Sequence, residues 1–161
     1  MNNKVYRIRD KKTGEFISLG YRSKTSWLVK PNAAMKEYPE LFKDRHADMK
    51  TTAMCWGFEC LDGWYPLINS LCAAIMWNPH TGKNVENPPT VSQVKEKYGT
   101  LRFYVNDSNE RQNNIIEFAE YLSGNICENC GSMRDVSRTK GWVKTRCLTC
   151  HQEAGDIPYG N

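Results

Sequence analysis

The stretch CENCGSMRDVSRTKGWVKTRCLTC, residues 127–150, contains two Cys-x-x-Cys pairs with 16 residues between them. Cys127 and Cys130 form the first pair, and Cys147 and Cys150 form the second. Four thiolates at about 2.3 Å from one ion complete a tetrahedral zinc shell, and each pair lets two sulfurs reach the same ion. The interval is long enough for two short strands and a turn. The spacing therefore predicts a C-terminal four-cysteine zinc ribbon with Zn as its cofactor.

A shell closed by four sulfurs leaves no position at which the metal could activate water, so the predicted site is structural and not catalytic. Free thiols or a redox-active pair are the alternatives, and the presence of both pairs argues against them. His151 follows Cys150 directly and could replace one ligand, although the set is complete without it. We expect His151 to lie beside the ligands or in solvent.

The interval between the pairs is basic and contains a single tryptophan, Trp142. A basic, aromatic face on a zinc ribbon can bind nucleic acid through phosphate contacts and base stacking. The alternative, which we favour, is that the charges are solvated and that Trp142 packs on the small core of the ribbon. The basic residues of the interval are Arg134, Arg138, Lys140, Lys144 and Arg146.

Exposed aromatic residues and arginines often anchor protein interfaces, which makes such residues candidates for contacts with a partner. Each aromatic residue of this kind is nevertheless more often part of a core. The candidate partner-binding residues are Trp142, Arg138, Lys140, Lys144 and Tyr98, with Trp27 and Trp77 as further aromatic candidates.

The length of 161 residues suggests one domain, or one domain with a small appendage, and 40% hydrophobic residues is enough for a compact core. The net charge of +4 is unevenly distributed, because residues 1–30 carry eight basic and two acidic residues and the rest has a net charge of −2. Four thiolates with one Zn²⁺ would lower the total to about +2. Since nucleic-acid binders usually have a strongly basic face, nucleic acid is the less favoured partner.

No apolar run approaches the roughly 20 residues that span a bilayer, and the opening MNNKVYRIRDKKTGEF lacks the apolar segment of a secretory signal. The seven cysteines are therefore interpreted as reduced thiols and metal ligands, and not as disulfides. These features predict a cytoplasmic protein without membrane contact.

Three cysteines lie outside the pairs: Cys55, Cys60 and Cys72. A second metal site would need another ligand such as His46 or His80, and buried structural thiols are the favoured interpretation. A cysteine nucleophile is a third alternative, but no local signature supports it. No phosphate-binding loop, nucleophile elbow or zinc-protease helix is present. We therefore expect no enzymatic activity.

Strand and turn patterns predict two β-hairpins. The first covers residues 4–22, and residues 23–31 are expected to continue as a strand up to their final proline. The second covers residues 91–105 and turns at Tyr98-Gly99.

Apolar periodicity predicts three helices, over residues 38–50, after a cap at Asp62, and after a cap at Asp107 or Ser108 with an end at Gly124. The residues expected to face the core are Leu41, Phe42 and Met49 in the first helix, Trp64, Leu67, Ile68, Leu71 and Ile75 in the second, and Ile115, Ile116, Ala119 and Leu122 in the third.

This order of elements predicts an α+β fold with antiparallel hairpins, two to three helices and a C-terminal zinc ribbon with four cysteine ligands. The expected divisions are a basic N-terminal β-hairpin segment (1–37), an α+β core (38–124), the zinc ribbon (125–155) and a loose tail (156–161).

Several stretches resemble a loosely spread group of small proteins from tailed bacteriophages, over roughly residues 38–150. The resemblance implies a phage origin and the host cytoplasm as the place of action. One departure is Leu61, since the group has glycine before DGW. The stretches are YPELFKDRH, CWGFECLDGWYPLI, QVKEKYGTLRFY and CENCG followed by the second Cys-x-x-Cys. Separately, YRIRDKKTGEF is similar to the opening of many small proteins of tailed bacteriophages.

In size and general character the chain also resembles the Lon protease inhibitors of T-even-type phages, which block the ATP-dependent Lon protease of the host. This resemblance implies a non-enzymatic protein that binds Lon, either across its substrate path or between its subunits. The alternative is a zinc-ribbon protein that binds nucleic acid in phage transcription or host takeover. The oligomeric state, including a homo-oligomer, stays open.

Overall fold

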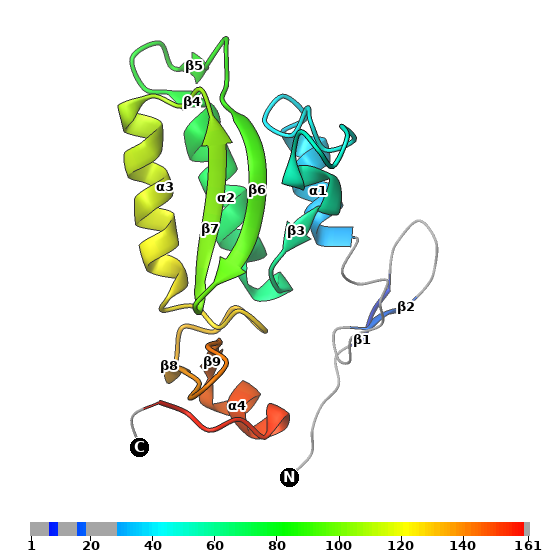
Figure 1. Ribbon diagram of the computed structural model, residues 1–161, viewed down its shortest axis with the longest axis vertical. Coiled ribbons are helices and arrows are strands. Elements are labelled where there is room, and N and C mark those ends of the chain that lie inside the picture. Colours follow the sequence, from blue (N-terminus) through cyan, green and yellow to red (C-terminus); the bar gives the residue numbers. More distant parts are fainter. Residues whose placement is uncertain (1–6, 10–15, 19–28, 160–161) are drawn as a thin grey trace.

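A computed structural model describes residues 7–9, 16–18 and 29–159, with side chains described from residue 33 onward. Helices lie beside a long β-hairpin, and a small cysteine-containing lobe lies at one end (Figure 1). The fold class is α+β, as the sequence predicts. The α-helices of the described part are α1 (Val29–Glu37), α2 (Tyr65–Met76), α3 (Glu110–Ser123) and α4 (Leu148–Ala154).

The central sheet has the order β3 (Phe58–Glu59), β6 (Thr90–Lys97), β7 (Thr100–Asn106). Strands β6 and β7 are antiparallel and joined by Tyr98 (φ 52°) and Gly99 (φ 76°), which confirms the predicted hairpin and its turn. Both central residues have positive φ, as the tightest hairpin turns require. Strand β3 pairs with β6 in parallel, so a short parallel strand extends the predicted antiparallel hairpin.

Helix α2 supplies much of the core, and its predicted apolar stripe is confirmed. Ile68, Leu71 and Ile75 are buried, together with Trp64 just before the helix. The cap prediction is wrong, because a short 3₁₀ helix, η3 (Asp62–Trp64), precedes α2 and places Trp64 at its N-cap. Helix α3 packs against both α2 and β7 (Figure 1).

Helix α3 is capped by Asn109 and not by the predicted Asp107 or Ser108. The Asn109 side chain accepts a hydrogen bond from Gln112 N, and the Gln112 side chain accepts one from Asn109 N. These reciprocal bonds form a capping box. Asp107 instead has a φ of 62°, which turns the chain from β7 toward the helix. Of the predicted inward residues, Ile116 and Ala119 are buried, and Ile115 and Leu122 are half-buried.

The helix predicted over residues 38–50 is replaced by a series of hydrogen-bonded turns. Leu41 and Phe42 are buried as expected, but Met49 is exposed. The physical reason is the main chain of Leu41, whose carbonyl accepts a hydrogen bond from Val91 N at 2.8 Å. A carbonyl that accepts a hydrogen bond from the sheet does not accept one from the next turn of a helix. Leu41 and Phe42 are therefore buried by a series of turns and not by a helix.

At the N-terminal end, β1 (Arg7–Arg9) pairs antiparallel with β2 (Phe16–Ser18), which confirms the strands of the first hairpin. The strand expected over residues 23–31 is wrong at its end, because α1 begins at Val29. Residues 23–28, which include the candidate contact Trp27, lie outside the described part. Pro31 then lies in the first turn of α1, where a missing N–H is tolerated.

The cysteine ribbon, residues 127–154, contains β8 (Val136–Arg138) paired antiparallel with β9 (Thr145–Cys147) and then α4, a helix that the sequence analysis missed. Residues 157–159 lie along this hairpin, with hydrogen bonds from Lys140 N to Ile157 O and from Tyr159 N to Arg138 O. Between α2 and β6 the chain contains a small ladder of β4 (Trp77–Asn78) and β5 (Lys83–Asn84).

The core and the cysteine ribbon meet at Gly63, where two backbones are in contact. Gly63 N donates to Glu128 O at 2.8 Å, and Trp64 Nε1 donates to Ile126 O at 2.9 Å. A Cβ on Gly63 would lie 2.2 Å from Cys127 O and 2.6 Å from Glu128 O. Only glycine fits against the first cysteine pair at this distance.

Leu61, at the position where the sequence resemblance led us to expect glycine, is accommodated without strain. Its φ of −88° and ψ of 162° are extended values that any residue adopts. Leu61 N donates to Glu128 Oε1 at 3.1 Å, so the turn before α2 is fixed by the ribbon and not by a glycine.

Gly63→Ala is expected to destabilise the protein by about 3 kcal/mol, because the methyl group would force the core and the ribbon apart. The matched control is Gly82→Ala, whose Cβ meets nothing within 4 Å but whose φ of +64° costs about 1–2 kcal/mol. Thermal and urea denaturation measure both. A Gly63→Ala cost no larger than that of Gly82→Ala would contradict the close contact.

Candidate metal centre and the adjoining surface

The four paired cysteines lie together at the base of the ribbon. The Sγ atoms of Cys127, Cys130, Cys147 and Cys150 are all within 4.8 Å of one another, and Cys130 Sγ lies 3.6 Å from Cys147 Sγ. Tetrahedral metal–sulfur bonds of about 2.3 Å place ligand sulfurs about 3.8 Å apart. The four residues could therefore hold one metal ion with little movement. No other such group of ligand side chains occurs in the described part of the chain.

Each half of the set is shaped by a short turn. In the first, Gly131 N donates to Cys127 O and Cys127 N donates to Ser132 O, both at 2.8 Å. Gly131 has a φ of 80°, a conformation that favours glycine. In the second, Cys147 ends β9 and Cys150 lies in the first turn of α4, so the pair spans a strand end and a helix start.

The surroundings of the sulfurs shift the pKa values of the thiols in different directions. Burial raises the pKa of Cys130 to about 11 and also raises that of Cys150. Burial opposes ionisation of Cys127 as well, but backbone N–H groups of Cys147, Cys130 and Asn129 bond its sulfur and lower its pKa. Because metal binding displaces the remaining protons, affinity for a metal ion should fall as the pH falls.

Asn129 and His151 flank ligand cysteines in the sequence but are not members of the cluster. Asn129 Nδ2 donates to Cys150 Sγ at 3.2 Å, which orients the sulfur. His151 is buried, with Nε2 at 3.1 Å from Ser137 Oγ and Nδ1 at 3.7 Å from Asp156 Oδ2. His151 thus lies beside the ligands inside the ribbon, as one of its two expected places, and not in solvent.

The remaining cysteines do not form a second cluster among the described residues. Cys55 is half-buried and its Sγ donates to Thr52 O at 3.3 Å. Cys60 and Cys72 are buried, and burial raises the pKa of Cys60 to about 12 and raises that of Cys72 as well. A thiol with such a pKa is a poor nucleophile near neutral pH.

Lys144, a predicted partner contact, lies in a charge network between ribbon and core. Its Nζ lies 2.6 Å from Glu96 Oε2 and 3.7 Å from Glu128 Oε2. The Glu128 side chain is only 2% exposed, and burial raises its pKa despite the nearby Lys144 ammonium. Arg146 forms a similar ion pair with Asp156. Both cations are therefore paired with carboxylates of the same chain.

Trp142 is 82% exposed, so the expectation that it packs on the ribbon core is wrong. It lies in the turn between β8 and β9, where Thr139 Oγ1 accepts from Lys144 N at 2.8 Å and donates to Trp142 O at 2.5 Å. These hydrogen bonds fix the backbone of the turn, and the Trp142 indole is left exposed to solvent. Lys140, in the same turn, is also exposed.

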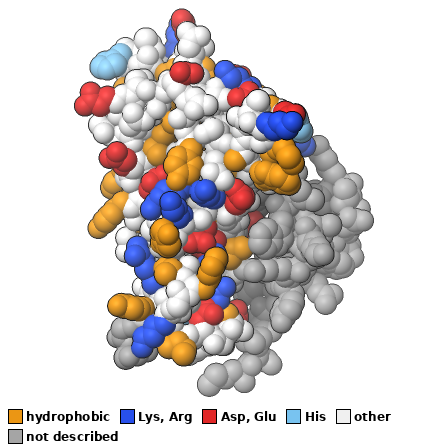
Figure 2. All heavy atoms as spheres, viewed as in Figure 1, with side chains coloured by type: hydrophobic (Ala, Val, Ile, Leu, Met, Phe, Trp, Pro, Cys, Tyr) orange, Lys and Arg blue, Asp and Glu red, His pale blue; other side chains and the backbone are white. Residues whose placement is uncertain are grey.

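Tyr98, the fifth predicted contact, is 71% exposed at the tip of the β6–β7 hairpin. The ribbon touches this tip, because Thr145 Oγ1 donates to Gly99 O at 2.5 Å. Arg138 lies near the same hairpin tip. Tyr98 and Arg138 line one hollow although they lie 40 positions apart in the sequence. The face in Figure 2 has hydrophobic side chains scattered among acidic and basic ones over the ribbon end.

Comparison with protein-family models, curated proteins and solved structures gives no match to this chain. The helices of the described part are all too short or too polar to cross a bilayer.

Wild-type protein is expected to bind one transition-metal ion per chain, and Cys147→Ser should lose it, because a buried hydroxyl is a poor replacement for a thiolate ligand. Loss of the ion should also lower the melting temperature. Cys55→Ser is the matched control and should keep both the ion and the melting temperature. Elemental analysis and calorimetry measure the two effects. Metal retained in Cys147→Ser, or lost in Cys55→Ser, would contradict the assignment.

Proposed function

We propose that the four cysteines hold one structural Zn²⁺. Four thiolates suit this ion, which prefers tetrahedral sulfur and nitrogen ligands. Zinc bound here would crosslink the first turn to the strand–helix junction and so contribute folding energy to the ribbon. With all four positions occupied by Cys127, Cys130, Cys147 and Cys150, the ion serves to hold the structure together.

We further propose that the protein acts by binding another protein and not by catalysis. The observation that carries this proposal is Trp142, a large aromatic side chain left 82% exposed on a turn whose backbone is fixed by hydrogen bonds. Rigid, exposed aromatic residues anchor interfaces because little conformational entropy is lost when they are buried. Tyr98, on the hairpin tip that the ribbon touches, extends the same end of the molecule.

The partner that the phage resemblance implies is the ATP-dependent Lon protease of the host, and we propose that the chain inhibits it stoichiometrically. Such an inhibitor needs a fixed surface and no reacting groups, which agrees with the closed metal centre and the raised thiol pKa values of Cys60 and Cys72. A ligand that bound between Lon subunits would favour the conformation it binds better, and would suppress ATP hydrolysis together with proteolysis. A ligand across the substrate path would suppress proteolysis alone.

The alternative, binding of nucleic acid, has a weaker basis in the ribbon. Lys144 and Arg146 are paired with carboxylates, so two of the five cations of the interval are not available to phosphates. The exposed cations Arg134 and Lys140 remain, beside Arg138. Each phosphate contact adds to the affinity for nucleic acid and to its dependence on salt concentration. With few contacts, binding would be weak and would depend only slightly on salt.

Trp142→Ala is expected to weaken inhibition of purified Lon at least tenfold, because a hot-spot aromatic contributes about 2 kcal/mol or more. Degradation of an unfolded substrate and ATP hydrolysis are measured in parallel against inhibitor concentration. Trp77→Ala is the matched control, since Trp77 is 46% exposed in β4 at the opposite end of the molecule (Figure 1). It should inhibit like the wild type.

Wild-type protein without any effect on Lon would overturn the proposed target. Normal inhibition by Trp142→Ala would overturn the proposed surface. Retention of the chain on DNA with strong salt dependence, and no effect on Lon, would favour the nucleic-acid alternative.

A further inference from the structure

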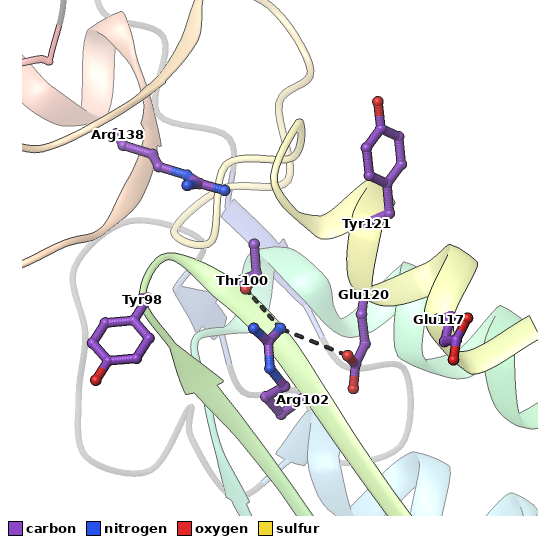
Figure 3. Close-up of a pocket in the computed structure, with 7 residues that line it drawn as sticks. All are labelled: Tyr98, Thr100, Arg102, Glu117, Glu120, Tyr121 and Arg138. Atoms are coloured by element: carbon purple, nitrogen blue, oxygen red, sulfur yellow. Dashed lines mark hydrogen bonds and ion pairs between the residues drawn. The ribbon is translucent and has the colours of Figure 1, made fainter. Parts of the chain in front are cut away.

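A hollow of about 460 Å³ lies where the β6–β7 turn, the end of α3 and strand β8 meet. Figure 3 shows the Arg138 side chain pointing toward Thr100, with Tyr98 and Tyr121 on either side. The two tyrosines are 71% and 73% exposed. The lining residues are Tyr98, Thr100, Arg102, Glu117, Glu120, Tyr121 and Arg138.

The two arginines of the hollow differ in how they are paired. Arg102 Nη1 donates to Thr100 Oγ1 and Leu101 O, each at 2.7 Å, and lies 3.6 Å from Glu120 Oε2. The guanidinium of Arg138 has no ion pair or side-chain hydrogen bond within the described part of the chain. Its five N–H donors are therefore available to a ligand.

The carboxylate of Glu120, which also lines the hollow, is already engaged by other groups. Its Oε1 accepts from Phe103 N at 2.9 Å, and its Oε2 faces Arg102. The Lys97 ammonium adds to the positive charge of this end, since Lys97 Nζ lies 5.7 Å from the centre of the Tyr98 ring. The end of the hollow near Arg138 thus has more positive than negative charge.

Two glycines lie beside the Arg138 side chain. A Cβ on Gly124 would lie 3.6 Å from Arg138 Nη2, and one on Gly99 would lie 3.7 Å from Arg138 Cδ. The Arg138 side chain therefore passes close to Gly99 in the hairpin turn and to Gly124 at the end of α3. An arginine placed in this way binds a carboxylate with less loss of side-chain entropy than a freely moving one.

We propose that this hollow receives an acidic side chain of the protein partner, with its carboxylate on Arg138 between Tyr98 and Tyr121. The proposal rests on the proposed function, since it names the chemistry of the partner surface. Arginine and tyrosine are the residue types that most often form interface hot spots, and the fork of a guanidinium matches a carboxylate.

The opposite end of the hollow distinguishes a protein from a polyanion. Glu117 lies there, away from Arg138 (Figure 3). A nucleic acid would bring further phosphates against Glu117 and Glu120, which costs energy through like-charge repulsion. A polypeptide segment can present one carboxylate to Arg138 and a donor or a basic residue to Glu117.

The first test is an NMR titration of the full-length wild-type protein with N-acetylglutamate N-methylamide, with the glutamine analogue, and with inorganic phosphate. The carboxylate probe should shift the Arg138 side-chain N–H resonance and those of the Tyr98 and Tyr121 rings, with millimolar affinity. The glutamine analogue should give at least tenfold weaker binding. Arg138→Gln should remove the response, and Lys140→Gln should not.

The second arm measures affinity for purified Lon. Arg138→Glu should weaken binding at least tenfold, and Arg134→Glu, at an exposed ribbon position, less than twofold. Absence of Lon binding by the wild type would overturn the proposed function, and the probe titration still decides the hollow. No shift with the carboxylate probe at 10 mM, or tighter binding of phosphate than of carboxylate, would overturn the inference. So would Lon binding unchanged in Arg138→Glu. Melting temperatures establish that each variant is folded.

Discussion

The contact of Gly63 with the backbone of the first cysteine pair is the constraint on which the arrangement of this protein depends. The two chain segments approach so closely that a Cβ at Gly63 would overlap Cys127 O, and Gly63 N donates to Glu128 O. Trp64, buried at the start of α2, donates its indole N–H to Ile126 O. The ribbon is therefore attached to the core at the start of its main helix, and whatever stabilises the cysteine turn also fixes this helix end.

The same attachment determines where the exposed residues lie. The β6–β7 tip bonds to Thr145, and Lys144 reaches Glu96 and Glu128 across the junction. These links hold the ribbon turn with Trp142 and the hairpin tip with Tyr98 at one end of the molecule. A metal ion at the cysteines would thus act at a distance, because it supports the backbone that presents the proposed binding surface.

Much of the local structure could be predicted from residue patterns. The Tyr98-Gly99 hairpin, the apolar stripe of α2 and the grouping of the four cysteines follow from spacing and turn chemistry, which depend on neighbours in sequence. The helix expected over residues 38–50 failed because a long-range bond from Val91 to Leu41 holds the main chain. Periodicity reports which side chains are buried, and it does not report which carbonyls a distant strand uses.

The surface was predicted less well, for a similar reason. Basic residues look alike in sequence, but their pairing in the fold differs. Lys144 forms ion pairs with Glu96 and Glu128, whereas the N–H donors of Arg138 have no such pairing within the described part of the chain. Only the folded arrangement separates them. Trp142 illustrates the converse, since composition favours burial and a turn closed by Thr139 leaves the indole in solvent. The DGW motif could have predicted the contact at Gly63. A glycine between a polar residue that can cap a helix and a tryptophan suggests a close approach of two backbones.

The most direct measurement of the central claim is amide hydrogen exchange at single-residue resolution, with the metal ion bound and after its removal by a chelator. The account predicts that Gly63 N–H and the ribbon amides lose protection when the ion is removed, while Val94 and Leu101 in the β6–β7 hairpin keep theirs. Unchanged protection at Gly63 after proven removal of the ion would contradict a metal-supported junction between core and ribbon.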